Sequence, residues 1–189
     1  MPGARRRESF AERRARRAEV TDPDAVLAAA ARYLESRSRA VAETRRHLVG
    51  AGYRAELVDG AIERLVGLGI LDDAAFAQAW VESRDRAHPR GERALRSELL
   101  RLGIDRELAE TVLRARAEQE PSGDQNPGDG APDERAAAAL LERRRASLER
   151  VADVRARRGR AYSLLARNGF DPETAGRAAE RFVRGDEPE

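Results

Sequence analysis

One stretch decides how this chain folds, and it reads Gly69-Ile70-Leu71-Asp72-Asp73-Ala74-Ala75-Phe76-Ala77-Gln78-Ala79-Trp80. Gly69 can adopt the left-handed backbone conformation that ends a helix. Asp72 can accept hydrogen bonds from the free amides at the start of the next helix, and such a cap contributes about 1 kcal/mol. The stretch therefore predicts a junction between two helices.

The helix after this junction carries two large aromatic side chains. Phe76 and Trp80 are four residues apart, with Ala77 and Val81 beside them, so they form one apolar ridge. Aromatic residues at helical spacing are more often core residues than a ligand-stacking site. We therefore expect Phe76 and Trp80 to be buried and to nucleate the central core.

A common pattern occurs three times along the chain. Aligned on Gly52, Gly103 and Gly169, each copy has a leucine four residues before the glycine, an apolar or aromatic residue directly after it, and a glutamate four residues after it. The leucine can pack the second helix, and the glycine permits a tight turn. Three upstream segments also correspond: Leu34-Glu35-Ser36-Arg37, Val81-Glu82-Ser83-Arg84 and Leu141-Glu142-Arg143-Arg144. The repeating unit is therefore three helices.

These patterns predict an all-α fold, an elongated array of three tandem three-helix repeats that resemble helix-turn-helix modules in size. The segments between them lack apolar periodicity and are expected to be flexible. The predicted parts are a disordered basic arm (1–22), repeat 1 (23–69), repeat 2 (70–117), a flexible acidic linker (118–132), repeat 3 (133–184) and an acidic tail (185–189).

Composition limits the class of protein. The chain has 189 residues, of which 41% are hydrophobic but only 4% aromatic, which suits helices packed through Leu, Val and Ala. It has no cysteine, which excludes disulfides and thiolate chemistry. No apolar run approaches the roughly 20 residues that span a bilayer, and the Arg-rich first segment lacks the apolar region of a secretory signal. We expect a cytoplasmic protein without a membrane partner.

Every basic residue of the chain is an arginine, and the charged residues are unevenly distributed along the sequence. The 36 basic residues include no lysine. A genome-wide codon bias explains this more simply than selection for guanidinium forks that bind phosphate or carboxylate, although both remain open. Residues 118–134 hold six acids and no base, whereas residues 135–170 hold ten arginines against three acids. An acidic segment therefore separates basic ones.

Catalysis finds little support in the residues. The two histidines, His47 and His88, lie in different repeats, with no cysteine and no zinc-binding pattern near them. The Asp72-Asp73 pair is better explained by the preference of helix N-termini for acids. No Gly-rich phosphate loop is present. We therefore expect no enzyme activity, no metal and no cofactor.

Binding is better supported, because basic residues recur at related positions of the repeats. A run of charge is usually only a solvated face, so a direct contact is one of two open interpretations. The candidate contact residues are Arg37, Arg39, Arg84, Arg86, Arg90, Arg93 and Arg144.

Together these residues resemble the RecX family of bacterial recombination regulators over roughly residues 25–184. The chain departs from the family pattern at Ile70, where an aromatic residue is usual, in its all-arginine basic set, and in the long acidic insertion, which leaves the placement of repeat 3 open. The motifs that carry the resemblance are Gly69-Ile70-Leu71-Asp72-Asp73, Phe76-Ala77, Arg84, Gly91, Glu98-Leu99, Gly103-Ile104 and Asn168-Gly169-Phe170.

The resemblance implies a modulator, usually an inhibitor, of the RecA recombinase in DNA repair, recombination and the SOS response, without chemistry of its own. The implied partners are the RecA filament and the single-stranded DNA within it, which the protein would bind only weakly alone. We expect a monomer. The alternative is an autonomous DNA-binding module acting as a transcriptional regulator. No helix with Asn, Gln and Arg at base-reading positions stands out to support that alternative.

Overall fold

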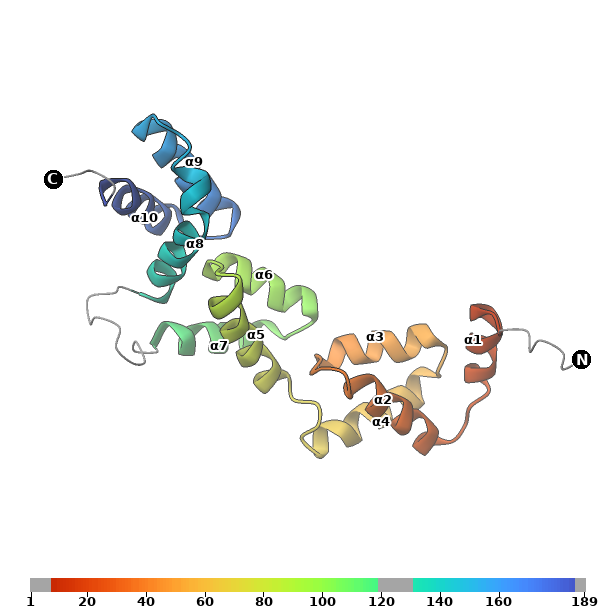
Figure 1. Cartoon of the computed structure of the whole chain (residues 1–189). Coiled ribbons are helices and arrows are strands. Elements are labelled where there is room, and N and C mark those ends of the chain that lie inside the picture. Colours follow the sequence, from red (N-terminus) through yellow and green to blue (C-terminus); the bar gives the residue numbers. More distant parts are fainter. Residues whose placement is uncertain (1–7, 119–130, 186–189) are drawn as a thin grey trace, which may run out of the picture. The chain divides into compact units, whose positions relative to one another are not determined.

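The computed structural model describes residues 8–118 and 131–185. These residues form α-helices and no strand, which confirms the all-α prediction (Figure 1). The helices are α1 (Phe10–Ala18), α2 (Pro23–Leu34), α3 (Val41–Ala51), α4 (Ala55–Gly67), α5 (Asp73–Ala87), α6 (Glu92–Leu102), α7 (Arg106–Glu118), α8 (Pro132–Leu148), α9 (Val154–Arg167) and α10 (Pro172–Arg184). After α1 they follow one another in groups of three, as the repeat predicts.

The chain divides into two compact units. The first comprises residues 1–76 and 102–104, and the second comprises residues 77–101 and 105–189. The first unit therefore holds α1 to α4 with the start of α5, and the second holds the rest of α5 through α10. No helix in residues 8–118 or 131–185 combines the length and apolar character needed to cross a membrane.

Each unit has its own apolar core, built from residues at helical spacing. In the first unit the core joins α2, α3 and α4 through Val26, Ala30, Leu48, Val58, Ala61, Ile62, Leu65 and Leu71. In the second unit, α8, α9 and α10 enclose Ala136, Ala137, Leu141, Leu148, Ala161, Leu165, Phe170, Ala175, Ala178, Ala179, Phe182 and Val183. Many of these residues are alanines, which explains how a chain poor in aromatic residues can still pack closely.

The glycines of the repeat have the backbone conformation that the pattern predicts. Gly52, Gly103 and Gly169 have φ values of 110°, 94° and 84°, and Gly69 has a φ of 68°. These angles lie in the left-handed region that a residue with a Cβ adopts only with strain. The leucine four residues before each repeat glycine is at most 1% exposed.

The junction at Gly69 also agrees with its prediction. Asp72 Oδ1 accepts hydrogen bonds from the amides of Ala74 and Ala75 at 2.8 and 2.9 Å. Asp73 has a different partner, because its Oδ1 accepts from the amide of Val41 at 2.8 Å. Val41 begins α3, whose own N-cap residue makes no side-chain cap bond. The two aspartates therefore cap two different helices, α5 and α3.

The prediction for the aromatic ridge is confirmed for Phe76 and wrong for Trp80. Phe76 is 5% exposed. Trp80 is only half-buried, and its indole Nε1 donates to Glu98 Oε2 at 3.0 Å. The polar nitrogen requires a partner, which keeps the ring at the edge of the core.

The expected basic arm is not wholly without structure. Phe10–Ala18 form α1, which begins at a capping box in which the Ser9 side chain accepts from the Glu12 amide and Glu12 accepts from the Ser9 amide. Arg17 Nη1 donates to the carbonyl of Ala51 at 3.3 Å, which ties α1 to α3. The capping box and this contact stabilise a helix that apolar periodicity does not reveal.

Repeat 3 is packed against repeat 2 within the second unit, so the acidic insertion does not leave it loose. The Gly91 amide donates to the Asn168 carbonyl at 3.0 Å, and Arg143 Nη2 donates to the Arg86 carbonyl at 2.6 Å. The predicted flexibility of residues 119–130 and the predicted tail after residue 185 lie outside the described residues.

Candidate protein and nucleic-acid interfaces

The first unit carries an arginine–aromatic–carboxylate cluster at the end of α2 and the start of α3. Arg39 lies over the Tyr33 ring, 3.9 Å from its centroid, and its Nη1 is 2.6 Å from Glu43 Oε1. The Tyr33 hydroxyl and Arg37 Nη2 donate to the same oxygen at 3.1 and 2.7 Å. Burial raises the pKa of Glu43, but the bonds from Arg39 and Tyr33 outweigh it and lower the pKa overall. The carboxylate therefore stays charged and holds both arginines.

His47 completes this cluster. Its ring stacks on Tyr33 with a centroid distance of 3.6 Å and an interplanar angle of 5°. Burial, followed by the charges of Arg39 and Arg17, lowers the pKa of His47. His47 is therefore an exposed residue whose neutral ring stacks on Tyr33 near pH 7.

The second unit repeats the arrangement with different residues. Trp80 stands in the position of Tyr33, and Glu98, like His47, lies five residues before its repeat glycine. Arg84 lies 4.4 Å from the Trp80 ring centroid, and its Nε is 2.7 Å from Glu98 Oε2. Arg90 Nε is 3.6 Å from Glu98 Oε1. In both repeats an aromatic side chain of the first helix therefore meets a polar side chain of the second, beneath an arginine.

A second ion pair also recurs at equivalent positions, joining the second and third helices of each repeat. Arg45 Nε and Nη2 are 2.7 and 3.1 Å from the Asp59 oxygens. Arg96 Nε and Nη2 are 2.7 and 3.0 Å from the Glu110 oxygens. The arginines lie seven residues before the repeat glycine and the acids seven after it. The pair can be found from the aligned repeats, because the arginine and the acid stand at the same distances from the glycine in both.

The candidate arginines fall into two groups, and the structure does not bring all seven together. Four of them are held in the clusters by Glu43 or Glu98: Arg37, Arg39, Arg84 and Arg90. The side chains of Arg86, Arg93 and Arg144 make no hydrogen bond or ion pair with another residue in the described ranges. The second group is therefore available for a partner without breaking an internal contact.

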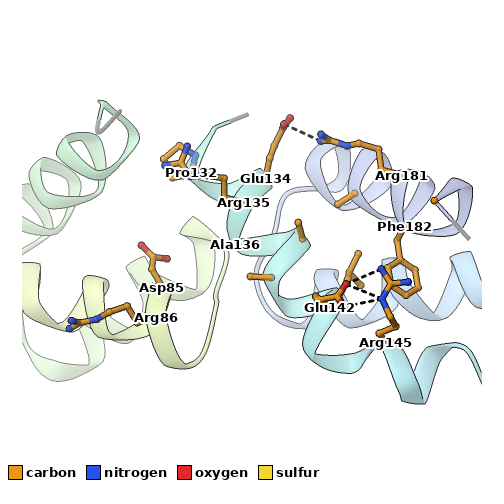
Figure 2. A pocket seen from close by; sticks show the side chains of 15 residues that line it. Asp85, Arg86, Pro132, Glu134, Arg135, Ala136, Glu142, Arg145, Arg181 and Phe182 are labelled. Atoms are coloured by element: carbon orange, nitrogen blue, oxygen red, sulfur yellow. Dashed lines mark hydrogen bonds and ion pairs between the residues drawn. The ribbon is translucent and has the colours of Figure 1, made fainter. Parts of the chain in front are cut away.

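A groove of about 650 Å³ lies beside α8 and α10 in the second unit. Figure 2 shows charged side chains around it, with ion pairs from Arg181 to Glu134 and from Arg145 to Glu142. Arg145 also lies 5.0 Å from the centroid of the Phe182 ring. The residues lining the groove include Asp85, Arg86, Pro132, Arg135, Ala136, Leu141 and Ala178. An apolar floor and a paired, charged rim are features of a protein-docking surface.

Arg116 is a buried, ion-paired residue that no pattern in the sequence singled out. Its side chain is 7% exposed and pairs with Asp85 and Asp133 at 2.9 and 2.6 Å. Burial lowers the pKa of Arg116, but the two acids outweigh this and raise it overall. Within the described part of the chain, no group of three or more His, Cys, Asp or Glu residues could hold a metal ion.

Comparison with known proteins identifies the family. The family model for the second three-helix domain of RecX matches residues 72–113, which cover α5, α6 and most of α7. The chain is 34% identical over 139 residues to "Regulatory protein RecX" of Mycobacterium sp. (strain KMS), covering 65% of this chain and 75% of that relative. This chain belongs to the RecX family. Its identity to "Regulatory protein RecX" of Mycolicibacterium vanbaalenii is 33% over 169 residues, covering 81% and 83% of the two chains.

Solved RecX structures share the fold. The crystal structure of RecX from Lactobacillus salivarius superposes with a TM-score of 0.68 at 17% identity, covering 85% of this chain and 96% of that one. A second structure, titled regulatory protein RecX, gives a TM-score of 0.65 over 90% of this chain and 73% of that one. The helical fold of this chain is therefore shared with these solved structures.

Proposed function

We propose that this protein regulates the RecA recombinase by binding its nucleoprotein filament and inhibiting its activity in DNA repair, recombination and the SOS response. The proposal rests first on the family, whose relatives bear the name "Regulatory protein RecX". It requires no catalysis and no cofactor. We infer a monomer that acts in the cytoplasm, where such filaments assemble.

The observation that carries the proposal is the recurrence of one surface cluster in successive repeats. Tyr33 and Trp80 occupy equivalent positions, and each ring lies beneath an arginine: Arg39 follows Tyr33 by six residues, and Arg84 follows Trp80 by four. A filament is itself a series of identical subunits. Several weak contacts joined in one chain raise the effective concentration of each contact after the first has formed. A repeated surface therefore suits a repeated partner.

The two groups of arginines have different proposed roles. Arg86, Arg93 and Arg144 are proposed to contact the filament or its DNA directly, because no internal partner competes for them. Arg37, Arg39, Arg84 and Arg90 are proposed to shape the docking surface, because Glu43 and Glu98 hold them in place. A charge-assisted hydrogen bond or ion pair with a carboxylate holds an arginine in a defined position on the surface.

The test is the DNA-dependent ATP hydrolysis of RecA in the presence of this protein. We expect hydrolysis to fall as the protein is added. The variant with Arg86, Arg93 and Arg144 all changed to Gln should inhibit less than the wild type. A matched control changes Arg32, Arg106 and Arg114, which are exposed arginines without an ion pair in the described ranges, and should inhibit normally. Unchanged hydrolysis at saturating wild-type protein would contradict the proposal.

A further inference from the structure

Helix α9 (Val154–Arg167) differs from the other helices in its charge. It contains no acidic residue. It packs with α8 and α10 (Figure 1). Arg155, Arg158, Arg160 and Arg167 are all exposed. Within the described residues none of these four side chains makes a hydrogen bond or an ion pair. An acid-free helix with unpaired arginines is an electrostatic footprint for a polyanion.

The acids around α9 do not neutralise it, because each has another partner. Arg116, Arg177 and Arg181 hold Asp133 and Glu134, and Arg145 holds Glu142 and Glu149. Glu173 and Glu180 pair with Arg177 and Arg184 of α10. Asp153 and Asp171 accept from the amides that begin α9 and α10. These eight are all the acids between residues 131 and 185.

Repeat 3 also lacks the ion pair that the other two repeats share. Tyr162 lies seven residues before Gly169, in the position of Arg45 and Arg96. Gly176 lies seven residues after Gly169, where the other repeats have the acidic partner. Tyr162 is 38% exposed, and a Cβ added at Gly176 would meet no atom within 4 Å. Repeat 3 therefore has neither member of the ion pair, and its residue at the arginine position is an exposed aromatic ring.

Two of the exposed arginines share one side of α9 with Tyr162, whereas Arg160 and Arg167 lie on the other side. Arg155, Arg158 and Tyr162 are spaced by three and four residues, so they form one stripe on the helix. Gly159 lies within this stripe and has open space where a Cβ would be. A helix of 14 residues is about 21 Å long, which is enough to follow several phosphates of a single strand.

We propose that this stripe of α9 (Arg155, Arg158 and Tyr162) is a binding surface for single-stranded nucleic acid. The arginines would contact phosphates, and the Tyr162 ring would stack on a base. A base face is accessible for stacking only where the strand is unpaired, which favours a single strand over a duplex. The assignment goes beyond the proposed action on RecA and does not depend on it. It places nucleic-acid contact in repeat 3, while the arginine–aromatic clusters lie in repeats 1 and 2.

The first test measures binding of the full chain to an oligothymidylate of about 20 nucleotides over a range of salt concentrations, without recombinase. The variant carries Arg155→Gln and Arg158→Gln. Each lost phosphate contact flattens the log-log salt slope by about 0.7, so we expect a total change of about 1.4 with weaker binding. The matched control carries Arg106→Gln and Arg114→Gln, which removes the same charge elsewhere. It should keep the wild-type slope.

Two results would overturn the proposal. Equal losses in both variants would mean that only net charge matters. Wild-type binding by the α9 variant, together with weaker binding to RecA, would assign the face to an acidic protein surface instead. Circular dichroism melts of both variants establish that they fold. Because recombinase is absent from the DNA assay, its failure would leave the proposed regulation of RecA untouched.

The second test isolates the stacking ring. Tyr162→Ala should weaken oligothymidylate binding by about fivefold or more without changing the salt slope, because a lost stack removes no phosphate contact. Tyr162→Phe keeps the ring and should bind like the wild type. Wild-type affinity in the alanine variant, or equal wild-type affinity for a duplex of the same length, would contradict the stacking role.

Discussion

Arg116 of α7 makes a two-point ion pair with Asp85 of α5, with Nε and Nη2 each 2.9 Å from a carboxylate oxygen. Its remaining nitrogen, Nη1, is 2.6 Å from Asp133 Oδ1 at the start of α8. The other oxygen of Asp133 accepts from the Glu92 amide at 3.0 Å. One buried guanidinium therefore joins the third helix of repeat 2 to its first helix and to repeat 3.

Replacing this arginine should strongly destabilise the second unit. Arg116→Met keeps much of the volume but leaves Asp85 and Asp133 without their cation, and breaking a buried pair in this way costs about 3–5 kcal/mol. Arg114→Met, on the same helix and exposed, should change stability by less than about 0.5 kcal/mol. Denaturant unfolding of the two variants measures the difference. Similar midpoints would show that the buried ion pairs do not stabilise the fold.

The close approach of Gly91 to Gly169 makes a second prediction about the packing of repeat 3. A Cβ at Gly91 would lie 2.4 Å from the backbone of Gly169 and Phe170, so Gly91→Ala must push the two repeats apart. We expect lower stability and faster proteolysis of the variant. Gly60→Ala is the control, because its Cβ would meet nothing within 4 Å inside α4. That change should stabilise by about 0.5–1 kcal/mol. Equal behaviour of the two variants would refute the close packing.

The stacked histidine predicts a pH dependence. Burial and the charges of Arg39 and Arg17 lower the pKa of His47 below its ordinary value of 6.5. Between the folded and the unfolded pKa of His47, the unfolded chain therefore binds more protons than the folded chain. The contribution of His47 to the free energy of unfolding is complete above about pH 6.5 and is lost as the pH falls through the folded pKa. His47→Gln should flatten the dependence, whereas His88→Gln should retain it. Chemical unfolding between about pH 5 and 7 measures it, and an unchanged slope in His47→Gln would contradict the stacking.

The sequence predicts best what neighbouring residues determine. The left-handed turn at Gly69 and the cap at Asp72 are local, and both agree with the structure. The capping box at Ser9 and Glu12 is equally local, but the arginines around it suggested disorder. Composition is a poor guide where a specific cap is present.

Contacts between distant segments could not be predicted in the same way. Asp73 caps a helix that begins 32 residues earlier, and Arg116 reaches acids 31 and 17 residues away. No periodicity within one helix encodes such pairs. The charge pattern likewise could not separate the arginines that Glu43 and Glu98 hold from Arg86, Arg93 and Arg144, or identify the unpaired set on α9.

The most direct test of the central proposal compares the affinity of this protein for single-stranded DNA coated with RecA and for the same DNA uncoated, at one salt concentration. Bare DNA would meet mainly arginines, and salt screens that attraction. Several linked contacts should add on the filament. We predict tighter binding to the coated DNA by at least about tenfold, with a fall in ATP hydrolysis. Equal affinities with undisturbed hydrolysis would contradict the regulator proposal and favour an autonomous DNA-binding module.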